Sequence, residues 1–340
     1  MARSKVIIIT HEFPPFYGGA GVYCEELATA LRRTGRTVEV WSPRRPGSLR
    51  LRHLVPFAWR VWCRREELRD CTVILGSRGA HMIFMAIPFK TAKLVSLLYG
   101  SELLRYGRRL RRLLNRVHCV IVSSKFAGTL VPEGIKTVVA LPAPCTVAMQ
   151  SVTDIKPHTG IRILTLARLH PRKGQVEVAQ ALVLLPSEYR KMVTYQVGGA
   201  GQRAYLHQIE RVCRTSGVAF EYLGPIPPEK LAATYAQCDI FVMTSRSLRH
   251  SVEGFGIAFL EAGFHGKPVI GYYSGGESEA VVTGETGWLV AEADIPAVAD
   301  KITQLIADPA LREKIGKQGR EHVRQFSWDH TAGIIAAAID

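Results

Sequence analysis

The sequence predicts an α/β protein made of two parallel β-sheets, with helices packed on both faces of each sheet. Short apolar runs rich in valine and isoleucine alternate with helical patterns along most of the 340 residues, which is typical of parallel sheets. A polar stretch at 151–160 interrupts the alternation, which then starts again. Hydrophobic residues form 47% of the chain, which suffices for a core in each of two ordinary-sized domains.

The first half begins with a buried apolar strand at 6–10. A helical pattern at 21–33 follows and ends at Gly35, since glycine readily takes the conformation that closes a helix. Further strands of this half are predicted at 37–41, 72–75, 93–98, 119–122 and 137–141.

The second half repeats this order of elements. Its strands are predicted at 161–167, 193–198, 219–223, 240–243 and 268–271, and its helices at 175–184, 205–215, 230–237 and 255–264. We predict a first domain at 1–150, a second at 151–320 and a C-terminal segment at 321–340 with a last helix at 328–339. Ligands of open parallel sheets bind beyond the C-terminal ends of the strands, so two facing domains would form a cleft between them.

The composition favours a protein of the reducing cytosol. The N-terminal apolar run at 6–9 is too short for a signal peptide, and no apolar run reaches membrane-spanning length. The seven cysteines are scattered and contain no Cys-x-x-Cys pair, so neither a disulfide framework nor a zinc site is predicted.

The net charge of +15 lies entirely on residues 1–150, which hold 24 Lys and Arg against 9 Asp and Glu. Two stretches of this half, 44–69 and 105–116, mix dense arginine with aromatic or leucine residues. Such a mixture suits an anionic membrane surface. The alternative is that both stretches are solvated helices whose leucines and tryptophans face the core. The charge also permits a nucleic-acid surface, but no recognised nucleic-acid-binding module accompanies it.

Two glutamates, Glu253 and Glu261, bracket a glycine turn that leads into an apolar stretch of helical character. If a helix starts near Phe255, the amides of Phe255, Gly256 and Ile257 and the positive end of the helix dipole suit a diphosphate. Eight residues of helix span about 12 Å. One carboxylate would then reach a donor sugar, and the other a ribose. The spacing alone also fits two glutamates on a solvated face.

A basic pair, Arg168 and Lys173, follows the first strand of the second half. A guanidinium and an ammonium at a strand end can neutralise a leaving diphosphate without a metal ion. The alternative is a surface cluster in a strongly basic protein. Because no Asp-x-Asp motif is present to carry a divalent ion, we expect metal-independent chemistry.

A glycine-rich turn at 18–21 follows the first strand. Gly18 and Gly19 would let a phosphate or a reacting sugar approach the backbone closely. A dinucleotide fingerprint is the first alternative, but Cys24 stands in place of its third glycine and the connection is too long for its tight turn. A turn that only caps the following helix is the second.

The chain resembles a known family at these residues. The stretch 253–261 matches the Glu-x7-Glu motif of retaining GT-B glycosyltransferases of family 4. The runs 262–270, 274–279 and 286–287 are similar to that family, as is 167–175. Within it, 171–175 and the extra residues 247–252 look most like phosphatidylinositol-mannoside mannosyltransferases.

The resemblance implies a GT-B fold of two Rossmann-like domains around a cleft, with a last helix that crosses back to the first domain. It implies that backbone groups near Leu223 and Ile226 meet the nucleobase and that Gly198 and Gly199 form a loop beside the donor. Tyr99 stands where the family often has a histidine near the donor sugar, so no charged group is expected there. The acceptor side is expected to hold Gly18, Tyr99 and Glu102, and Gly19 is expected beside the donor.

We predict a retaining, metal-independent hexosyltransferase without a cofactor, acting in cell-envelope polysaccharide or glycolipid synthesis. Arg168, Lys173 and Glu253 are the expected catalytic residues. The partners are a nucleotide-sugar donor and a lipid-linked or membrane-associated acceptor, with no nucleic acid. The protein would be cytoplasmic and peripheral on the inner face of the cell membrane. Two alternatives are a soluble small-molecule acceptor and a catalytically silent nucleotide-binding protein.

Overall fold

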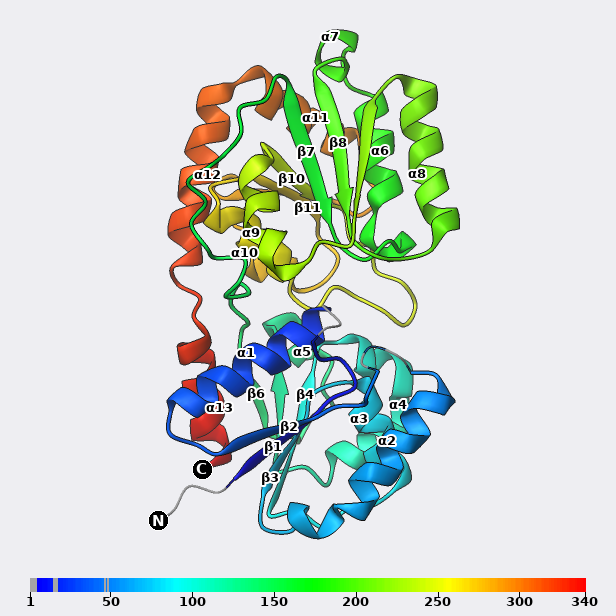
Figure 1. The fold of residues 1–340 in the computed structure, drawn as a ribbon, viewed down its shortest axis with the longest axis vertical. Coiled ribbons are helices and arrows are strands. Elements are labelled where there is room, and N and C mark those ends of the chain that lie inside the picture. The colour runs from blue at the N-terminus through cyan, green and yellow to red at the C-terminus, as the bar shows by residue number, and fades with distance from the viewer. Residues whose placement is uncertain (1–4, 15–17, 46, 48) are drawn as a thin grey trace. The chain divides into compact units, whose positions relative to one another are not determined.

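The structure is a computed structural model that describes residues 5–14, 18–45, 47 and 49–340 (Figure 1). The chain packs into two units. The first consists of Met1–Ala143, Arg249–Gly254 and Phe326–Asp340, and the second of Pro144–Leu248 and Phe255–Gln325. The chain therefore passes from one unit to the other at four points along the sequence.

The first unit contains a six-stranded parallel sheet in the order β2-β1-β3-β4-β5-β6. Its strands are β1 (Val6–Ile9), β2 (Val38–Trp41), β3 (Thr72–Leu75), β4 (Lys93–Leu98), β5 (Cys119–Val122) and β6 (Thr137–Val139). Its helices are α1 (Gly19–Arg33), α2 (Leu51–Cys63), the 3-10 helix η1 (Arg65–Leu68), α3 (Arg78–Ala86), α4 (Ser101–Leu114), α5 (Lys125–Thr129) and α13 (Trp328–Ile339).

Strand β1 explains why this sheet is covered on both faces. Successive side chains of a strand point to opposite faces. Ile7 and Ile9 pack into a core with α2, α3 and α4, whereas Val6 and Ile8 pack into a second core with α1 and α13. A strand buried on both faces is continuously apolar, as this one is.

The second unit also contains a six-stranded parallel sheet, in the order β12-β11-β10-β7-β8-β9. Its strands are β7 (Ile161–Leu166), β8 (Val193–Gly198), β9 (Ala219–Gly224), β10 (Ile240–Met243), β11 (Val269–Tyr272) and β12 (Gly287–Val290). Its helices are the 3-10 helix η2 (Pro171–Lys173), α6 (Gln175–Val183), α7 (Ser187–Arg190), α8 (Arg203–Ser216), α9 (Pro228–Gln237), α10 (Ile257–Phe264), the 3-10 helix η3 (Gly276–Glu279), α11 (Ile295–Ala307) and α12 (Pro309–Val323).

The predicted α/β fold with two parallel sheets is confirmed, and every predicted strand is present with small shifts at its ends. Several element ends differ from the prediction by one or two residues. Helix α1 begins at Gly19 instead of residue 21, and β6 ends at Val139 instead of residue 141. Helix α10 begins at Ile257 and not near Phe255, because Gly256 adopts a left-handed conformation with φ +88° that cannot continue a right-handed helix.

Helix α13 completes the first unit. The ring of Trp328 packs edge-on against that of Tyr23 in α1, with 5.1 Å between centroids. At the other end of α13, the buried Arg36 donates to the carboxylate of Asp340 at 2.6 Å. Within the described part of the chain, no helix combines the length and the apolar character needed to cross a bilayer.

The two basic stretches of the first unit differ in what they expose. In α4, Leu110, Leu113 and Leu114 are buried, as the solvated-helix alternative predicts. In α2, Phe57 is buried, but the side chain of Trp59 is 66% exposed. The stretch on α2 therefore retains an exposed aromatic residue among its arginines, whereas the leucines of α4 belong to the core.

Candidate functional site

Both sheets have a point at which the strand order reverses. In the second unit, the chain runs from β7 outward through β8 and β9, and from β10 outward in the other direction through β11 and β12. Ligands of such sheets bind at this switch point, beyond the C-terminal ends of the strands. Arg168 and Lys173 follow β7, and the segment 244–256 follows β10, so the predicted basic pair lies at the switch point.

The connection after β7 is fixed against the end of β10. Lys173 ends the short 3-10 helix η2, and its Nζ lies 3.8 Å from the Met243 Sδ of β10. Gly174 follows in the left-handed conformation, and its carbonyl accepts a hydrogen bond from the Thr244 hydroxyl at 2.9 Å. The amide of Arg246 donates to the Arg172 carbonyl at 2.7 Å. These contacts hold the lysine beside the end of the neighbouring strand.

The lowered pKa of His170 reflects its burial and the positive charge of this connection. Burial lowers the pKa of His170, and the nearby charges of Arg172, Arg168 and Lys173 lower it further. The side chain of Arg168 is exposed, while its carbonyl accepts from the Gln175 side chain at 2.9 Å. The loop therefore concentrates cations at one strand end, where an anion would be stabilised.

The predicted donor residues after β8 and β9 lie beside this loop. Gly199 has φ +132°, and a Cβ there would lie 2.0 Å from the Ala167 carbonyl oxygen. The Gly199 amide donates to the Gly224 carbonyl at 2.8 Å, and the Ala167 amide to the Gly198 carbonyl at 3.0 Å. Ile226 packs against Gly198, with its Cγ1 3.1 Å from where a Cβ would stand. Leu223 lies in β9, next to Gly224.

Glu261 lies less far along its helix than predicted. It is the fifth residue of α10, little more than one turn from Ile257, because the helix starts two residues later than expected. The first amides of α10 are those of Ile257 onward, so Phe255 and Gly256 precede the helix and do not belong to its first turn. The two glutamates also fall in different units, Glu253 in the first and Glu261 in the second.

The carboxylate of Glu261 is buried and bonded at both oxygens. Oε2 accepts from the Tyr235 hydroxyl at 2.6 Å, and Oε1 accepts from the Cys145 amide at 3.2 Å. Burial, and then the charge of Glu261, raises the pKa of Tyr235 well above its usual value, so this hydroxyl keeps its proton and donates.

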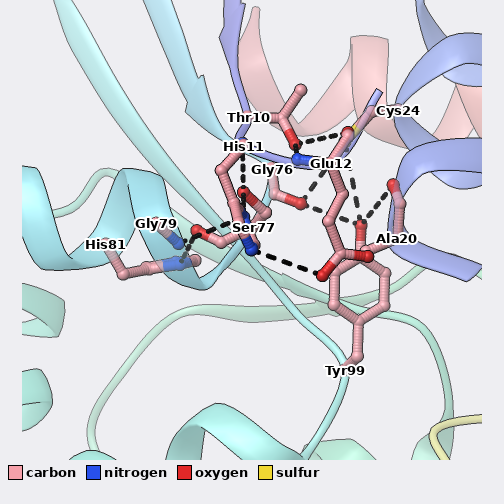
Figure 2. Close-up of polar contacts among 10 residues, drawn as sticks. All are labelled: Thr10, His11, Glu12, Ala20, Cys24, Gly76, Ser77, Gly79, His81 and Tyr99. Carbon is pink, nitrogen blue, oxygen red and sulfur yellow. Dashed lines mark hydrogen bonds and ion pairs between the residues drawn. The ribbon is translucent and has the colours of Figure 1, made fainter. Parts of the chain in front are cut away.

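The switch point of the first sheet lies between β1 and β3, and a buried polar cluster occupies it (Figure 2). The Ser77 hydroxyl accepts from the His11 amide at 2.8 Å and lies 2.7 Å from His11 Nδ1. The Gly79 amide donates to the same Nδ1 at 3.3 Å, so Nδ1 is an acceptor. The proton of the neutral ring is then on Nε2, which lies 3.5 Å from Glu12 Oε1.

No role was predicted for this cluster from the sequence. The available signal was the polar run Thr10, His11 and Glu12 directly after a buried strand. His81, in the same cluster, contacts the Ser77 carbonyl at 2.8 Å and the Ser96 hydroxyl at 2.7 Å. Burial lowers the pKa of His81 to about 4, so this ring is neutral and structural.

Tyr99 and Glu102, expected on the acceptor side, bond to the backbone around them. The Tyr99 hydroxyl donates to the Gly76 carbonyl at 3.1 Å (Figure 2), with the Ala20 carbonyl at 3.4 Å. Burial raises the pKa of Tyr99 well above its usual value, so the hydroxyl stays protonated. Glu102 is buried, which raises its pKa, and Oε2 accepts from the Tyr99 amide at 3.1 Å.

Gly19, at the start of α1, differs from Gly199 in how closely other described atoms approach it. Gly18 is the N-cap residue in extended backbone, and Gly19 is the first residue of α1. A Cβ at Gly19 would meet no atom of the described residues within 4 Å. Packing within the described chain therefore does not require glycine at position 19.

Comparisons with known proteins agree on one family. A family model described as "Glycosyl transferases group 1" matches residues 152–322. A GDP-mannose-dependent alpha-(1-6)-phosphatidylinositol monomannoside mannosyltransferase from Mycolicibacterium smegmatis is 28% identical, over 93% of this chain and 92% of that protein.

Two solved structures have the same fold over nearly the whole chain. Sucrose-phosphate synthase from Thermosynechococcus elongatus superimposes with a TM-score of 0.84 at 20% identity, over 98% of both chains. The Anabaena protein Alr3699/HepE in complex with UDP and glucose superimposes with a TM-score of 0.79 at 21% identity, over 99% of both chains.

Proposed function

Because this chain belongs to the glycosyl transferases group 1 family and has the GT-B fold, we propose that it is a retaining hexosyltransferase. It moves a hexose from a nucleoside-diphosphate sugar to an acceptor without a metal ion or cofactor. The observation that carries the proposal is the cationic connection after β7, fixed against the end of β10 at the switch point of the second sheet. A departing diphosphate needs positive charge in this position.

Each proposed site residue has one task. Arg168, Lys173 and the first amides of α10, at Ile257, stabilise the departing diphosphate. Glu253 holds the donor sugar, and Glu261 accepts hydrogen bonds from the ribose. The backbone around Gly198, Gly199, Leu223 and Ile226 surrounds the nucleobase, and Phe255 and Gly256 lead into the diphosphate site.

The reaction is a substitution at the anomeric carbon. The acceptor hydroxyl oxygen forms the new bond to this carbon while the bond from the carbon to the diphosphate oxygen breaks with its electron pair. The acceptor proton moves to the leaving phosphate on the same face of the sugar, which retains the configuration. This route uses no side-chain nucleophile.

The donor is testable directly. The mannosyltransferase relative makes GDP-mannose the first candidate, and UDP-glucose is the natural comparison from the HepE structures. The test incubates the protein with each donor and follows release of the nucleoside diphosphate with and without acceptor. Turnover of one donor supports the enzyme. Tight nucleotide binding without release from any donor favours the silent nucleotide-binding protein.

Glu261→Gln is expected to weaken binding of the free nucleoside diphosphate about tenfold, because a hydrogen bond to a charged group is lost in every nucleotide ligand. Glu253→Gln should leave that binding nearly unchanged and weaken only the intact donor. Calorimetry with both ligands measures this. Tyr235→Phe removes one partner of Glu261 and should give a smaller loss in the same direction. A Glu253 variant that loses the free diphosphate instead would reverse the two roles.

Gly19→Ala tests whether Gly19 contacts a substrate or serves only at the start of helix α1. No described atom lies within 4 Å of where a Cβ would stand, and alanine favours helices, so stability should stay the same or rise by about 0.5–1 kcal/mol. Transfer should fall, because the methyl group takes space that a substrate needs. Thermal midpoint and kcat/KM are measured on the same preparation. Unchanged kcat/KM at unchanged stability would show that Gly19 only begins helix α1 and contacts no substrate.

The proposed acceptor is lipid-linked or membrane-associated, with the protein cytoplasmic and peripheral on the membrane. Support comes from α2, where Leu51 is 71%, Val55 59% and Trp59 66% exposed among arginines. Each basic residue near an anionic bilayer contributes about 1 kcal/mol. Sedimentation with anionic and neutral vesicles, at low and high salt, tests docking. Equal recovery in the supernatant with both vesicle types at low salt would favour a soluble acceptor.

A further inference from the structure

The first unit contains a pocket of ≈ 390 Å³ where the β2–α2 connection meets α2. Four arginines and a histidine line it, namely Arg44, Arg45, Arg52, Arg60 and His53. The rest of the wall is apolar and includes Pro56 and Phe57. A small concave site with several convergent donors and an apolar wall is the usual form of a ligand pocket.

The helix places these groups on one side. Residues four apart share a face of a helix, so Arg52, Pro56 and Arg60 form one row along α2, with His53 and Phe57 beside it. Arg60 is held in place, since its Nη2 donates to the Ser42 carbonyl at 2.7 Å and its guanidinium lies 5.7 Å from the Phe57 ring centroid.

The pocket holds positive charge without a protein counter-charge. Over the part of the chain that is described, no carboxylate lies within ion-pair distance of the four arginines. The carboxylate of Glu39, in the adjacent strand β2, is engaged by Lys5 and Arg64 instead. Desolvation lowers the pKa of His53, and the charges of Arg52, Arg45 and Arg50 lower it further. Guanidinium groups gathered in this way match the geometry of phosphate oxygens.

The pocket is connected to the switch point of the first sheet. The Gly47 amide, in the β2–α2 connection, donates to the His11 carbonyl at 2.6 Å, directly after β1. The glycine turn that leads into α1 follows the same strand. The row of exposed apolar residues on α2, Leu51, Val55 and Trp59, lies next to the row that lines the pocket.

We propose that this arginine pocket binds a phosphate ester of the acceptor, with Arg44, Arg45 and Arg52 contacting the phosphate and Arg60 shaping the wall. That the ligand is the acceptor rests on the proposed transfer reaction. Binding of a phosphate ester by the pocket does not depend on that reaction. The phosphate can belong to a lipid headgroup or to a soluble phosphorylated molecule. The exposed apolar row beside the pocket suits the lipid, and the experiment separates the two sources.

The test compares a pocket variant with a charge-matched control. The pocket variant carries Arg44→Gln, Arg45→Gln and Arg52→Gln, and the control carries Lys90→Gln, Lys125→Gln and Lys136→Gln, three exposed cations of the same unit. Calorimetry measures binding of glycerol phosphate. Sedimentation measures binding to phosphatidylcholine vesicles with and without phosphatidic acid. Circular dichroism checks the fold, and donor hydrolysis without acceptor serves as an independent readout.

The pocket variant should lose binding about tenfold or more relative to the control, since charge-assisted hydrogen bonds to phosphate are lost. Loss in the glycerol phosphate arm identifies a soluble phosphate ester as sufficient, and loss confined to phosphatidic acid vesicles identifies the lipid. Equal losses in variant and control, or none in either, overturn the pocket. Donor hydrolysis should be the same in both. Nucleotide binding by the unmodified protein without release from any donor, with or without acceptor, would refute the transferase while leaving the phosphate result to stand by itself.

Discussion

Arg168→Ala and Lys173→Ala are each expected to lower the rate constant of transfer by about 10²–10³-fold, the cost of removing one group that stabilises transition-state charge. Both residues follow β7 at the switch point of the second sheet. Hydrogen bonds from Thr244 to Gly174 and from Arg246 to Arg172 fix their loop against the residues that follow β10. The charge on the diphosphate grows as its bond to the sugar breaks. The loss should therefore appear in kcat more than in KM.

Single-turnover measurements with enzyme in excess over donor isolate this step. Arg172→Ala is the matched control. It removes a cation from the same short helix, and Arg172 has no proposed contact with the diphosphate. The contact of residue 172 with Arg246 is made by its carbonyl and survives the substitution. Because no transition-state contact is proposed for Arg172, the control should change the rate less than about threefold. Turnover near the unmodified level in both test variants, with an intact fold, would remove the basic pair from the mechanism.

Gly199→Ala is expected to lower the free energy of unfolding strongly. Its φ of +132° is a backbone conformation that residues other than glycine rarely adopt. A Cβ would stand 2.0 Å from the Ala167 carbonyl oxygen and 2.7 Å from the carbonyl carbon. These atoms belong to backbone at the end of β7, which cannot move without breaking the hydrogen bonds between β7 and β8. We expect a loss of about 3–5 kcal/mol in the free energy of unfolding, from strain plus steric overlap.

Gly217→Ala is the control for this prediction. Gly217 also has a positive φ, of +73°, but a Cβ there would meet no described atom within 4 Å. It should cost only the conformational strain, about 1–2 kcal/mol. Urea unfolding of both variants, followed by circular dichroism, measures the difference. Equal midpoints would show that the β7–β8 end relaxes around the methyl group.

The parts of the fold that the sequence predicts are those with a local signal. Each strand found in advance is a short β-branched or apolar run between turns, and β1 is buried on both faces. Strand β12 was not predicted, because Gly287 opens it and its four residues lack a distinctive pattern. The start of α10 was also misplaced, since the left-handed conformation of Gly256 is a property of the folded loop.

The site shows the same limit. Arg168 and Lys173 were predicted because basic residues directly after an apolar strand can be recognised in the sequence alone. The contact of Ser77 with His11 spans 66 positions, and that of Cys145 with Glu261 spans 116, so neither leaves a local pattern. The carboxylate of Glu261 was predicted to accept hydrogen bonds from a ribose, and no protein partner was predicted for it. Its bonds to Tyr235 and Cys145 follow from tertiary packing, which spacing along the chain does not encode.

Helix α13 has a consequence for how the protein is synthesised. Trp328, Ala332, Ile335 and Ile339 cover the face of the first sheet on which Tyr23 and Leu27 also pack. Helix α1 precedes α13 along the chain by nearly the whole second unit, so it is translated long before the helix that covers it. The apolar surface around α1 therefore stays uncovered while the residues between the two helices are translated, when partly folded chains are prone to aggregate. The first unit can complete its fold only after α13 has left the ribosome, and until then this surface is open to a chaperone.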